Sequence, residues 1–412
     1  MAIELSSLTF TEQDDVVPMF GVEEIVNIGV TNTLAGNDRI TGTGNNYGFI
    51  NVGTLNTDDD NDIIIGNANN TGIIIGFGST LNTGKGNDRI SGTSSVNNGL
   101  INAGTFITSD GDDDISGIGI ANGFINEGTG TFNSGDGDDN ILGSSNNNGF
   151  INRGVFSTED GDDEISGVSL RFGIITASGS ILDTGNGNDK ITGLGSSSVG
   201  ISNGGTINTG DGEDSIISEG DFINRGEVFL GDGNDSITNI RSSNPNFQNL
   251  NFIGTGDGDD IIRTRVIYNE GFINTGNGDD SIIVDIIDDL TGASYGIKNN
   301  GGAINMGDGN DSIIANEGFE SAENSSGAWF LGEGNDYIKG FGSGDFYGGN
   351  GQDTLELTPG TYTVGIWGEE DISPIFTKDD QLMITSEFEK LKAGSTIYDF
   401  TSLTAGQIIV VA

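Results

Sequence analysis

The sequence contains no cysteine and no histidine, and only 4 of its 412 residues are proline. Without cysteine there are no disulfides and no thiolate metal ligands. Without either residue, Ser-His and Cys-His catalytic machinery and zincin motifs are excluded. No stretch approaches the roughly 18 apolar residues of a membrane span, so we expect no membrane insertion. The N-terminus has no basic start followed by a long apolar run, which argues against a cleaved secretory signal.

Basic residues are also scarce. The chain has 15 Lys and Arg against 62 Asp and Glu, a formal net charge of −47. Such a charge repels DNA, RNA and anionic membranes, so we expect no nucleic-acid partner. The acidic residues cluster in short runs beside glycine, and this clustering predicts specific sites for hard cations.

Glycine, in contrast, is abundant, with 71 copies. They lack collagen's strict three-residue period, which excludes a triple helix. The charge alone favours disorder, but 33% of residues are hydrophobic and they recur at fixed positions. The sequence is therefore that of a folded repeat protein.

The repeat unit reads x-G-x-G-[ND]-D-x-[IL], with an aliphatic residue two positions after each aspartate. Successive aspartates are 17 to 31 residues apart, most often 24 to 26. This pattern predicts an all-β chain, a right-handed parallel β-solenoid or β-roll of about 14 coils of roughly 25 residues. The repeated aspartates are Asp38, Asp62, Asp88, Asp113, Asp139, Asp163, Asp189, Asp214, Asp235, Asp260, Asp280, Asp311, Asp336 and Asp353.

A second motif, G-F-I-N-x-G, lies midway between the aspartates and predicts two or three short strands per coil. At Ile253, Ile273 and Ile304 only three residues, instead of eight, separate its isoleucine from the next loop glycine. We therefore expect a side of variable length after this motif. Its asparagines are predicted to form one amide ladder at a turn: Asn51, Asn102, Asn126, Asn152, Asn224, Asn274 and Asn305.

The loop resembles the RTX, or haemolysin-type, calcium-binding nonapeptide G-G-x-G-x-D-x-U-x, where U is a large aliphatic residue. Residues 348–356, GGNGQDTLE, are a full match, and most other copies replace the first glycine, often with threonine. The resemblance covers residues 34–357. It implies Ca²⁺ bound between stacked loops and export by a type I secretion transporter. One loop per coil, where typical members have two, implies one calcium edge and one Asn/Gly edge.

Aspartate supplies a hard anionic oxygen, and glycine permits the positive φ that turns carbonyl oxygens into a loop. Carboxylates about 5 Å apart repel by roughly 1 kcal/mol in water, so we expect the metal-free chain to be unfolded or loosely folded. Fourteen loops allow up to about 13 Ca²⁺; plain Asp-Gly turns and Mg²⁺ sites are the less favoured alternatives. Besides the fourteen aspartates, the predicted metal-site residues are Gly84, Gly86, Gly135, Gly137, Gly185, Gly187, Gly210, Gly212, Gly231, Gly233, Gly256, Gly258, Gly276, Gly278, Gly307, Gly309, Gly332, Gly334, Gly349 and Gly351.

Several loops depart from the pattern. Asp58 and Asp60 replace both glycines of the second loop, while Ser109 and Glu159 replace the first loop glycine elsewhere. We expect distorted or weak sites there, and only half a site at the incomplete first loop, residues 35–38.

Composition changes at both ends of the repeats. We predict an N-terminal cap at 1–33, the solenoid at 34–357, and a C-terminal cap and secretion signal at 358–412. The last segment is poorer in glycine and resembles the tails of cyanobacterial RTX proteins; a plain β-cap is the alternative reading, and both can hold. Residues 387–392 are the one place where we expect a helical turn or two.

The sequence predicts a non-enzymatic protein with no catalytic or cofactor-binding residue beyond the metal ligands. Its few arginines form no repeated groove pattern, which disfavours a β-helical lyase. We expect a secreted, calcium-dependent structural or surface protein acting in a matrix, a coat or adhesion, with self-assembly or cell-surface glycan as further partners. The alternative is a ligand-binding solenoid for glycan or for ice. Ice is disfavoured because the outward threonines do not repeat in paired columns in the sequence.

Overall fold

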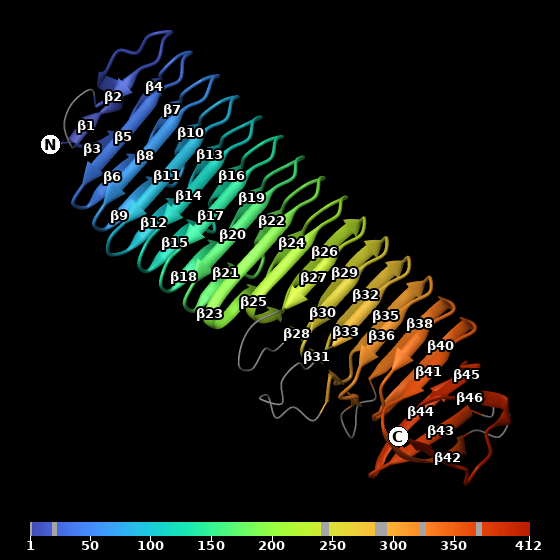
Figure 1. Ribbon diagram of the computed structural model, residues 1–412. Coiled ribbons are helices and arrows are strands. Elements are labelled where there is room, and N and C mark those ends of the chain that lie inside the picture. Colours follow the sequence, from blue (N-terminus) through green and yellow to red (C-terminus); the bar gives the residue numbers. More distant parts are fainter. Residues whose placement is uncertain (1, 19–22, 240–246, 285–294, 322–326, 368–372) are drawn as a thin grey trace. The chain divides into compact units, whose positions relative to one another are not determined.

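The computed structural model describes residues 2–18, 23–239, 247–284, 295–321, 327–367 and 373–412. The chain forms two compact units, Met1–Asp221 and Phe222–Ala412 (Figure 1). The boundaries between caps and solenoid at residues 33/34 and 357/358 were inferred from changes in composition, and they remain predictions.

In the first unit each coil carries three short strands, and each strand pairs in parallel with its counterpart in the next coil. Ile64, Ile90 and Ile115 are aligned in this way in successive coils. The predicted all-β parallel solenoid is confirmed. The only helical elements among the described residues are the 3-10 turns η1 (Leu5–Ser7) and η2 (Phe400–Ser402). No helix in the described part of the chain is long and apolar enough to span a membrane.

The first strands of the coils are β2 (Val16–Val17), β5 (Arg39–Gly44), β8 (Ile63–Ala68), β11 (Arg89–Ser94), β14 (Asp114–Ile118), β17 (Asn140–Ser144), β20 (Glu164–Ser169) and the start of β23 (Lys190–Asn203). The second strands are β3 (Glu24–Asn27), β6 (Tyr47–Asn51), β9 (Thr71–Ile75), β12 (Asn98–Asn102), β15 (Asn122–Asn126), β18 (Asn148–Asn152), β21 (Phe172–Thr176) and the end of β23, with β1 (Ala2–Glu4) beside β3. The third strands are β4 (Val30–Asn32), β7 (Thr54–Asn56), β10 (Thr80–Asn82), β13 (Thr105–Ile107), β16 (Thr131–Asn133), β19 (Val155–Ser157), β22 (Ile181–Asp183) and β24 (Thr206–Asn208).

Each strand of the first unit contributes one inward column to the core. The first strands bury isoleucines such as Ile90, while the second and third strands bury Leu, Ile and Phe. Phe132 stacks on Phe156 with ring centroids 4.1 Å apart, and Phe124 lies edge-on to Phe150 at 5.5 Å. Alternation within each strand places these side chains on one face, so stacking the coils buries them in continuous ladders.

Paired glycines close the narrow end of these coils. A Cβ added to Gly92, on the first strand, would lie 2.4 Å from the carbonyl oxygen of Gly99 on the second strand. The two strands therefore approach backbone to backbone, which only glycine permits.

In the second unit the first strands are β27 (Ser236–Asn239), β30 (Ile261–Thr264), β33 (Ser281–Val284), β36 (Ser312–Ala315), β39 (Tyr337–Lys339) and β41 (Thr354–Leu357). The second strands are β28 (Phe247–Asn249), β31 (Ile267–Asn269), β34 (Ile297–Asn299) and β37 (Phe319–Glu320), and the third strands are β26 (Glu227–Asp232), β29 (Phe252–Asp257), β32 (Phe272–Asn277), β35 (Ala303–Asp308), β38 (Ala328–Gly334) and β40 (Gly344–Gly351). β25 (Ser215–Asn224) crosses the unit boundary.

The coils of the second unit are shorter at a different place from the one predicted. Ile253, Ile273 and Ile304 align with one another on third strands, so they are not members of the second-strand G-F-I-N column. The missing residues lie instead between the first and second strands, where β30 ends at Thr264 and β31 begins at Ile267. The prediction of a variable side after the motif was wrong because the same Ile-Asn pair occurs in two columns.

The predicted asparagine ladder is correspondingly two ladders. On the second strands, the Nδ2 of Asn102 donates to the Oδ1 of Asn126 at 2.9 Å, and Asn126 donates to Asn152 at 2.9 Å. In the second unit this turn ladder continues through Asn224, Asn249, Asn269 and Asn299. Asn274 and Asn305 instead pair with each other on the third strands, at 2.6 Å.

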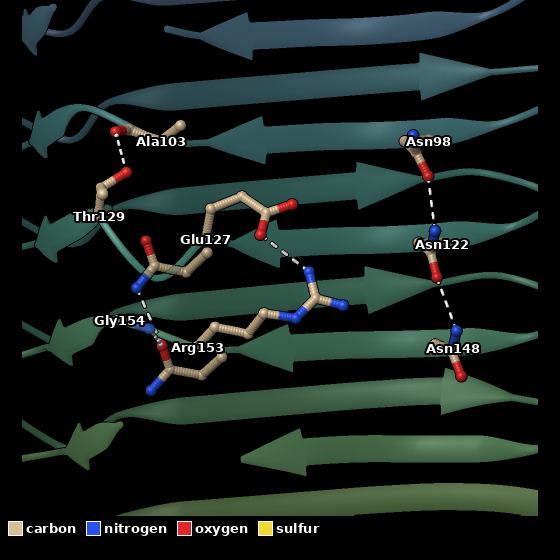
Figure 2. A network of polar contacts seen from close by, with 10 residues as sticks. Asn98, Ala103, Asn122, Glu127, Thr129, Asn148, Arg153 and Gly154 are labelled. Carbon is tan, nitrogen blue, oxygen red and sulfur yellow. Dashed lines mark hydrogen bonds and ion pairs between the residues drawn. The ribbon is translucent and has the colours of Figure 1, made fainter. Parts of the chain in front are cut away.

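Further polar ladders cover the outer face of the second strands (Figure 2). Asn98, Asn122 and Asn148 are linked by amide hydrogen bonds of 2.7 Å, and Arg153 pairs with Glu127 at 2.9 Å. Like side chains at the same register satisfy one another, so the repeat itself fixes the surface rotamers.

The chain ends in a partly antiparallel module of β42 (Gly360–Trp367), β43 (Ser373–Lys378), β44 (Gln381–Ser386), β45 (Lys390–Ala393), β46 (Thr396–Asp399) and β47 (Ile408–Val411). β44 and β45 continue the third and first columns by pairing in parallel with β40 and β41. The helical turn predicted at 387–392 is wrong, since this segment enters strand β45. The parallel pairing with β41 overrides its local helix propensity.

Candidate metal centre

All fourteen predicted aspartates occupy the same position, one residue before a first strand. Each is 0 to 2% exposed, which is unusual for a charged residue. The aliphatic residue two positions later points into the core and anchors the strand, as Ile90 does after Asp88.

Within each unit the aspartates form a ladder along successive coils. The main-chain N–H of Asp62 donates to Oδ1 of Asp88 at 2.7 Å, and the N–H of Asp88 donates to Oδ1 of Asp113 at 2.7 Å. The same bond, 2.7 to 2.9 Å long, connects Asp38 through Asp214 in the first unit and Asp235 through Asp353 in the second. The stacking of carboxylates expected from the sequence is therefore present within each unit.

The second carboxylate oxygen is the unusual feature of this ladder. Oδ2 is buried without a hydrogen-bond partner in Asp38, Asp62, Asp88, Asp113, Asp139, Asp163, Asp189, Asp260, Asp280, Asp311, Asp336 and Asp353. A buried anionic oxygen without a donor carries a large desolvation penalty unless a cation neutralises it. Twelve such oxygens recur at one register position, an arrangement that cations bound between the coils would neutralise.

A hydroxyl five residues before the aspartate lies beside it in every coil of the first unit. In several coils this hydroxyl donates to a main-chain carbonyl oxygen of the next coil. Thr57 Oγ1 donates to the carbonyl oxygen of Thr83 at 3.1 Å, and Thr158 Oγ1 donates to that of Thr184 at 3.1 Å. This explains why threonine replaces the first glycine of the motif.

Burial raises the pKa of these carboxyl groups well above the ordinary 3.8. The pKa reaches about 8 at Asp62, Asp113 and Asp189, and about 6 at Asp336 and Asp353. Desolvation is the main cause; the main-chain N–H from the preceding coil opposes it, as does the nearby hydroxyl at Asp62, Asp113 and Asp189. Binding of a proton or of a cation would each relieve this desolvation.

The loop backbone is set by both conformation and space. All twenty predicted loop glycines have positive φ. A Cβ on Gly276 would lie 1.7 Å from the carbonyl oxygen of Gly256 in the preceding coil. The loops that lack glycine keep the same conformation, with φ of 65° at Asp58, 93° at Asp60 and 66° at Glu159, so their backbones are strained but not rearranged.

The residue before each aspartate forms a second, exposed ladder. Oδ1 of Asp138 accepts the N–H of Asp162 at 2.9 Å, and Oδ1 of Asp162 accepts the N–H of Asn188 at 2.7 Å. This residue is Asn or Asp in twelve of the fourteen loops, with Glu213 and Gln352 in the other two, and the bond accounts for the [ND]-D pair. The sequence analysis recognised the pair without recognising this role.

Two carboxylates at the ends of the column were missed. Asp15 donates its N–H to Oδ1 of Asp38 at 2.8 Å, and Val17 pairs with Ile40, so residues 14–17 repeat the D-D-x-V pattern without glycines. The Oδ2 of Asp15 accepts the N–H of Thr11 at 2.8 Å. At the other end Oε2 of Glu389 accepts the N–H of Asp353 at 2.7 Å.

Within the ranges that the structure describes, no three Asp, Glu, Cys or His side chains converge on one point. Each coil adds one carboxylate to the column, so a cation between two coils must take its remaining ligands from main-chain oxygens. Ca²⁺ accepts such mixed carboxylate and carbonyl sets.

No family model matches the chain, and no curated protein matches it. Among solved structures the chain is similar to a hyperactive, Ca²⁺-dependent, β-helical antifreeze protein from an Antarctic bacterium. The identity is 21%, the match covers 74% of this chain and 84% of that chain, and the TM-score is 0.43. The resemblance to RTX loops therefore rests on this chain's own residues.

Proposed function

We propose that this chain is a Ca²⁺-binding β-solenoid that folds on binding calcium and serves outside the cell as a structural or surface protein. The column of buried aspartates, each with one unpartnered oxygen, carries the proposal. The donor set supports Ca²⁺ over Mg²⁺ because it consists of carboxylates and main-chain carbonyls in glycine loops, whereas Mg²⁺ retains several waters.

The cation-holding residues are the fourteen aspartates, one per loop, and the carbonyl groups of the loop glycines. Bound Ca²⁺ supplies the positive charge that these buried carboxylates lack. The aspartates then hold adjacent coils together by the Oδ1 hydrogen bond on one side and by the shared cation on the other. Binding is thereby coupled to folding, because the unfolded chain has no preformed site.

The coupling of calcium binding to folding also supports the proposal that the chain is secreted. Calcium sites of other extracellular modules have dissociation constants of about 10⁻⁴ to 10⁻³ M, and sites of such an affinity here would fill outside the cell and remain empty in the cytosol. Export of the unfolded chain through a type I transporter, followed by folding outside, fits this difference. A role in a matrix, a coat or adhesion is the proposed use of the folded solenoid.

The test is a calcium titration followed by circular dichroism and light scattering. We expect little β-structure in excess chelator and a cooperative gain on adding Ca²⁺, with Mg²⁺ at equal concentration ineffective. A compact β-structure that persists in chelator at pH 8 contradicts the proposal. Scattering that rises with calcium supports assembly.

Ice binding is a second candidate, favoured by an observation on the third strands of the first unit. The outward threonines form no pair of columns, as expected from the sequence, but a single column rich in threonine lies beside a column rich in asparagine. One column holds Val30, Thr54, Thr80, Thr105, Thr131, Val155, Ile181 and Thr206; the other holds Asn32, Asn56, Asn82, Ile107, Asn133, Ser157, Asp183 and Asn208. The columns were missed because the loops between them vary in length.

This face, the Thr/Asn face, presents hydroxyl and methyl groups at the strand spacing of about 4.8 Å. Val and Ile keep the branched shape of Thr where they interrupt its column. Asn56 donates to Asn32 at 2.9 Å and Asn208 donates to Asp183 at 2.8 Å, so these side chains are held in place by their neighbours in the column. Such a regular, preordered array suits a lattice of ordered water.

Thermal hysteresis of the calcium-loaded protein tests this candidate. We expect activity that Thr80→Tyr and Thr131→Tyr abolish, while Val96→Tyr, at a turn position already 62% exposed, leaves it unchanged. The absence of hysteresis in the wild type removes the candidate and leaves the calcium proposal intact. Glycan binding is less favoured, because the outward rings of Phe252 and Phe272 are stacked, which occupies the faces a sugar needs.

A further inference from the structure

Glu389 takes the aspartate position in the strand that follows the last repeat. Leu391 pairs with Leu355, so Glu389 stands one residue before its strand, as Asp353 does. The N–H of Lys390 donates to the carbonyl oxygen of Asp353 at 3.0 Å, and the N–H of Thr354 donates to that of Asp336 at 2.8 Å. The C-terminal module thus copies the ladder of the coils.

The space beside this carboxylate is lined by oxygens. Asp353 is 0% exposed, and its Oδ2 has no hydrogen-bond partner. A Cβ placed on Gly348 would lie 2.8 Å from that Oδ2 and 2.0 Å from the carbonyl oxygen of Glu387. Both oxygens therefore flank the space that a side chain at residue 348 would fill, and this is the one loop whose first motif residue is glycine.

The surrounding side chains hold Glu389 in place without neutralising it. Phe388 is buried and stacks on Phe400 at 5.7 Å, which fixes the segment against the module. The nearest lysines are engaged elsewhere, Lys390 with Asp399 and Lys392 with Glu356.

We propose that Glu389, the Asp353 carboxylate and the Glu387 carbonyl form a last divalent-cation site, which fastens the C-terminal strands β43–β47 to the coils. The inference rests on the proposed calcium function and adds a consequence to it. When calcium is scarce, Asp353 and Glu389 repel each other and the C-terminal strands separate from β40 and β41. Calcium thereby controls whether the end of the chain is accessible.

Hydrogen exchange of the full chain during a Ca²⁺ titration tests this inference, with Glu389→Gln compared with Asp399→Asn. Both variants remove one carboxylate from the C-terminal strands, but Asp399 is exposed and paired with Lys390. We expect Glu389→Gln to raise the calcium concentration that protects residues 373–412 by about tenfold. Protection of the coils at 235–336 should remain at wild-type calcium, and the calorimetric stoichiometry should fall by one.

The outcomes separate the two proposals. A wild type that takes up no calcium refutes the proposed function, whereas a calcium-binding wild type with an unchanged Glu389→Gln titration refutes only the last site. If Glu389→Gln loses order throughout the chain, the same calcium titration is carried out on Glu389→Asp, which keeps the carboxylate but shortens the side chain. Calcium-dependent protection of residues 373–412 at a shifted midpoint supports the site, and protection independent of calcium overturns it.

Discussion

Each unit has its own aspartate column of the same design, and the two units differ in almost everything around it. In the second unit every loop glycine of the motif is present, whereas the first unit places Leu34, Asp58, Asp60, Ser109 and Glu159 at positive φ. The hydroxyl beside the aspartate occurs in every coil of the first unit, but the second unit has Leu230, Met306, Leu331 and Gly348 at that position in four coils. What stays constant is the buried aspartate and the aliphatic residue after it. These two define the coil, while glycines and hydroxyls tune it.

The aspartates of the two units also differ in how strongly burial acts on them. The pKa lies at about 7 to 8 from Asp62 to Asp189, at about 6 at Asp214 and at about 6 to 7 from Asp260 to Asp353. Desolvation raises the pKa in both units and outweighs the hydroxyls that lower it.

The largest expected effect is a pH dependence of the chelated protein. Because the folded-state pKa values exceed 3.8, protonation stabilises the fold below about pH 4, and this stability is lost as pH rises through 6 to 8. The loss ends near pH 7 at Asp280 and Asp311 of the second unit, and it continues to about pH 8 at Asp62 of the first. We expect both units to be protected from hydrogen exchange at pH 5 in chelator, and the first to be the less protected at pH 8. If the two units were equally protected from exchange at both pH values, the predicted difference between them would be wrong.

A smaller effect is expected from Gly276→Ala in the second unit. Gly276 has φ 110°, and an added Cβ would lie 1.7 Å from a backbone oxygen, so we expect a loss of about 3 kcal/mol in unfolding free energy with calcium present. Gly78→Ala in the first unit is the matched control, since its φ of 72° is also positive but its Cβ meets nothing within 4 Å. It should cost only about 1 kcal/mol. Equal losses would mean that conformation, and not coil spacing, selects glycine.

Removing one ligand should have a more local effect. Asp163→Asn keeps the Oδ1 hydrogen bond but removes the charge, so we expect the calcium midpoint of the first unit to rise about tenfold, with that of the second unit unchanged. Glu164→Gln removes the same charge from the neighbouring residue. Glu164 is half-exposed and paired with Lys190, so this control should shift little. Asp280→Asn should instead raise the calcium midpoint of the second unit and leave that of the first unit unchanged.

The aspartate column was predictable from sequence because one oxygen ligand and one core anchor are fixed two residues apart. The Ile-Asn pairs were not assignable, because Asn102 at a turn and Asn274 on a third strand have the same neighbours in sequence and different partners in space. The Thr/Asn face was missed for a similar reason. Its strands have three residues, and the loops between them vary too much to reveal a register.

The terminal carboxylates show a different limit. Asp15 and Glu389 take their places through strand pairing alone, without the paired glycines that mark most of the other loops. Glycine is favoured where one loop stacks closely on another, and each of these residues has a loop on one side only. A search based on the loop motif therefore ends one coil too early at both ends.

The smallest expected effect is a gain in the stability of the calcium-loaded first unit. Ser109 occupies a loop glycine position of the first unit with φ 65°, a conformation that costs a non-glycine residue roughly 1 kcal/mol. Among the described residues its hydroxyl makes one side-chain hydrogen bond, to Oδ1 of Asn82 at 3.5 Å, which is long and half-exposed, so little is lost with the side chain. Ser109→Gly should therefore stabilise the calcium-loaded first unit by about 1 kcal/mol in denaturant melts. The reverse change in the next coil, Gly135→Ser, should cost more, because its Cβ would lie 2.3 Å from the backbone of Ser109. A destabilised Ser109→Gly variant would mean that the first unit's departures from glycine are adaptations of its loops rather than tolerated strain.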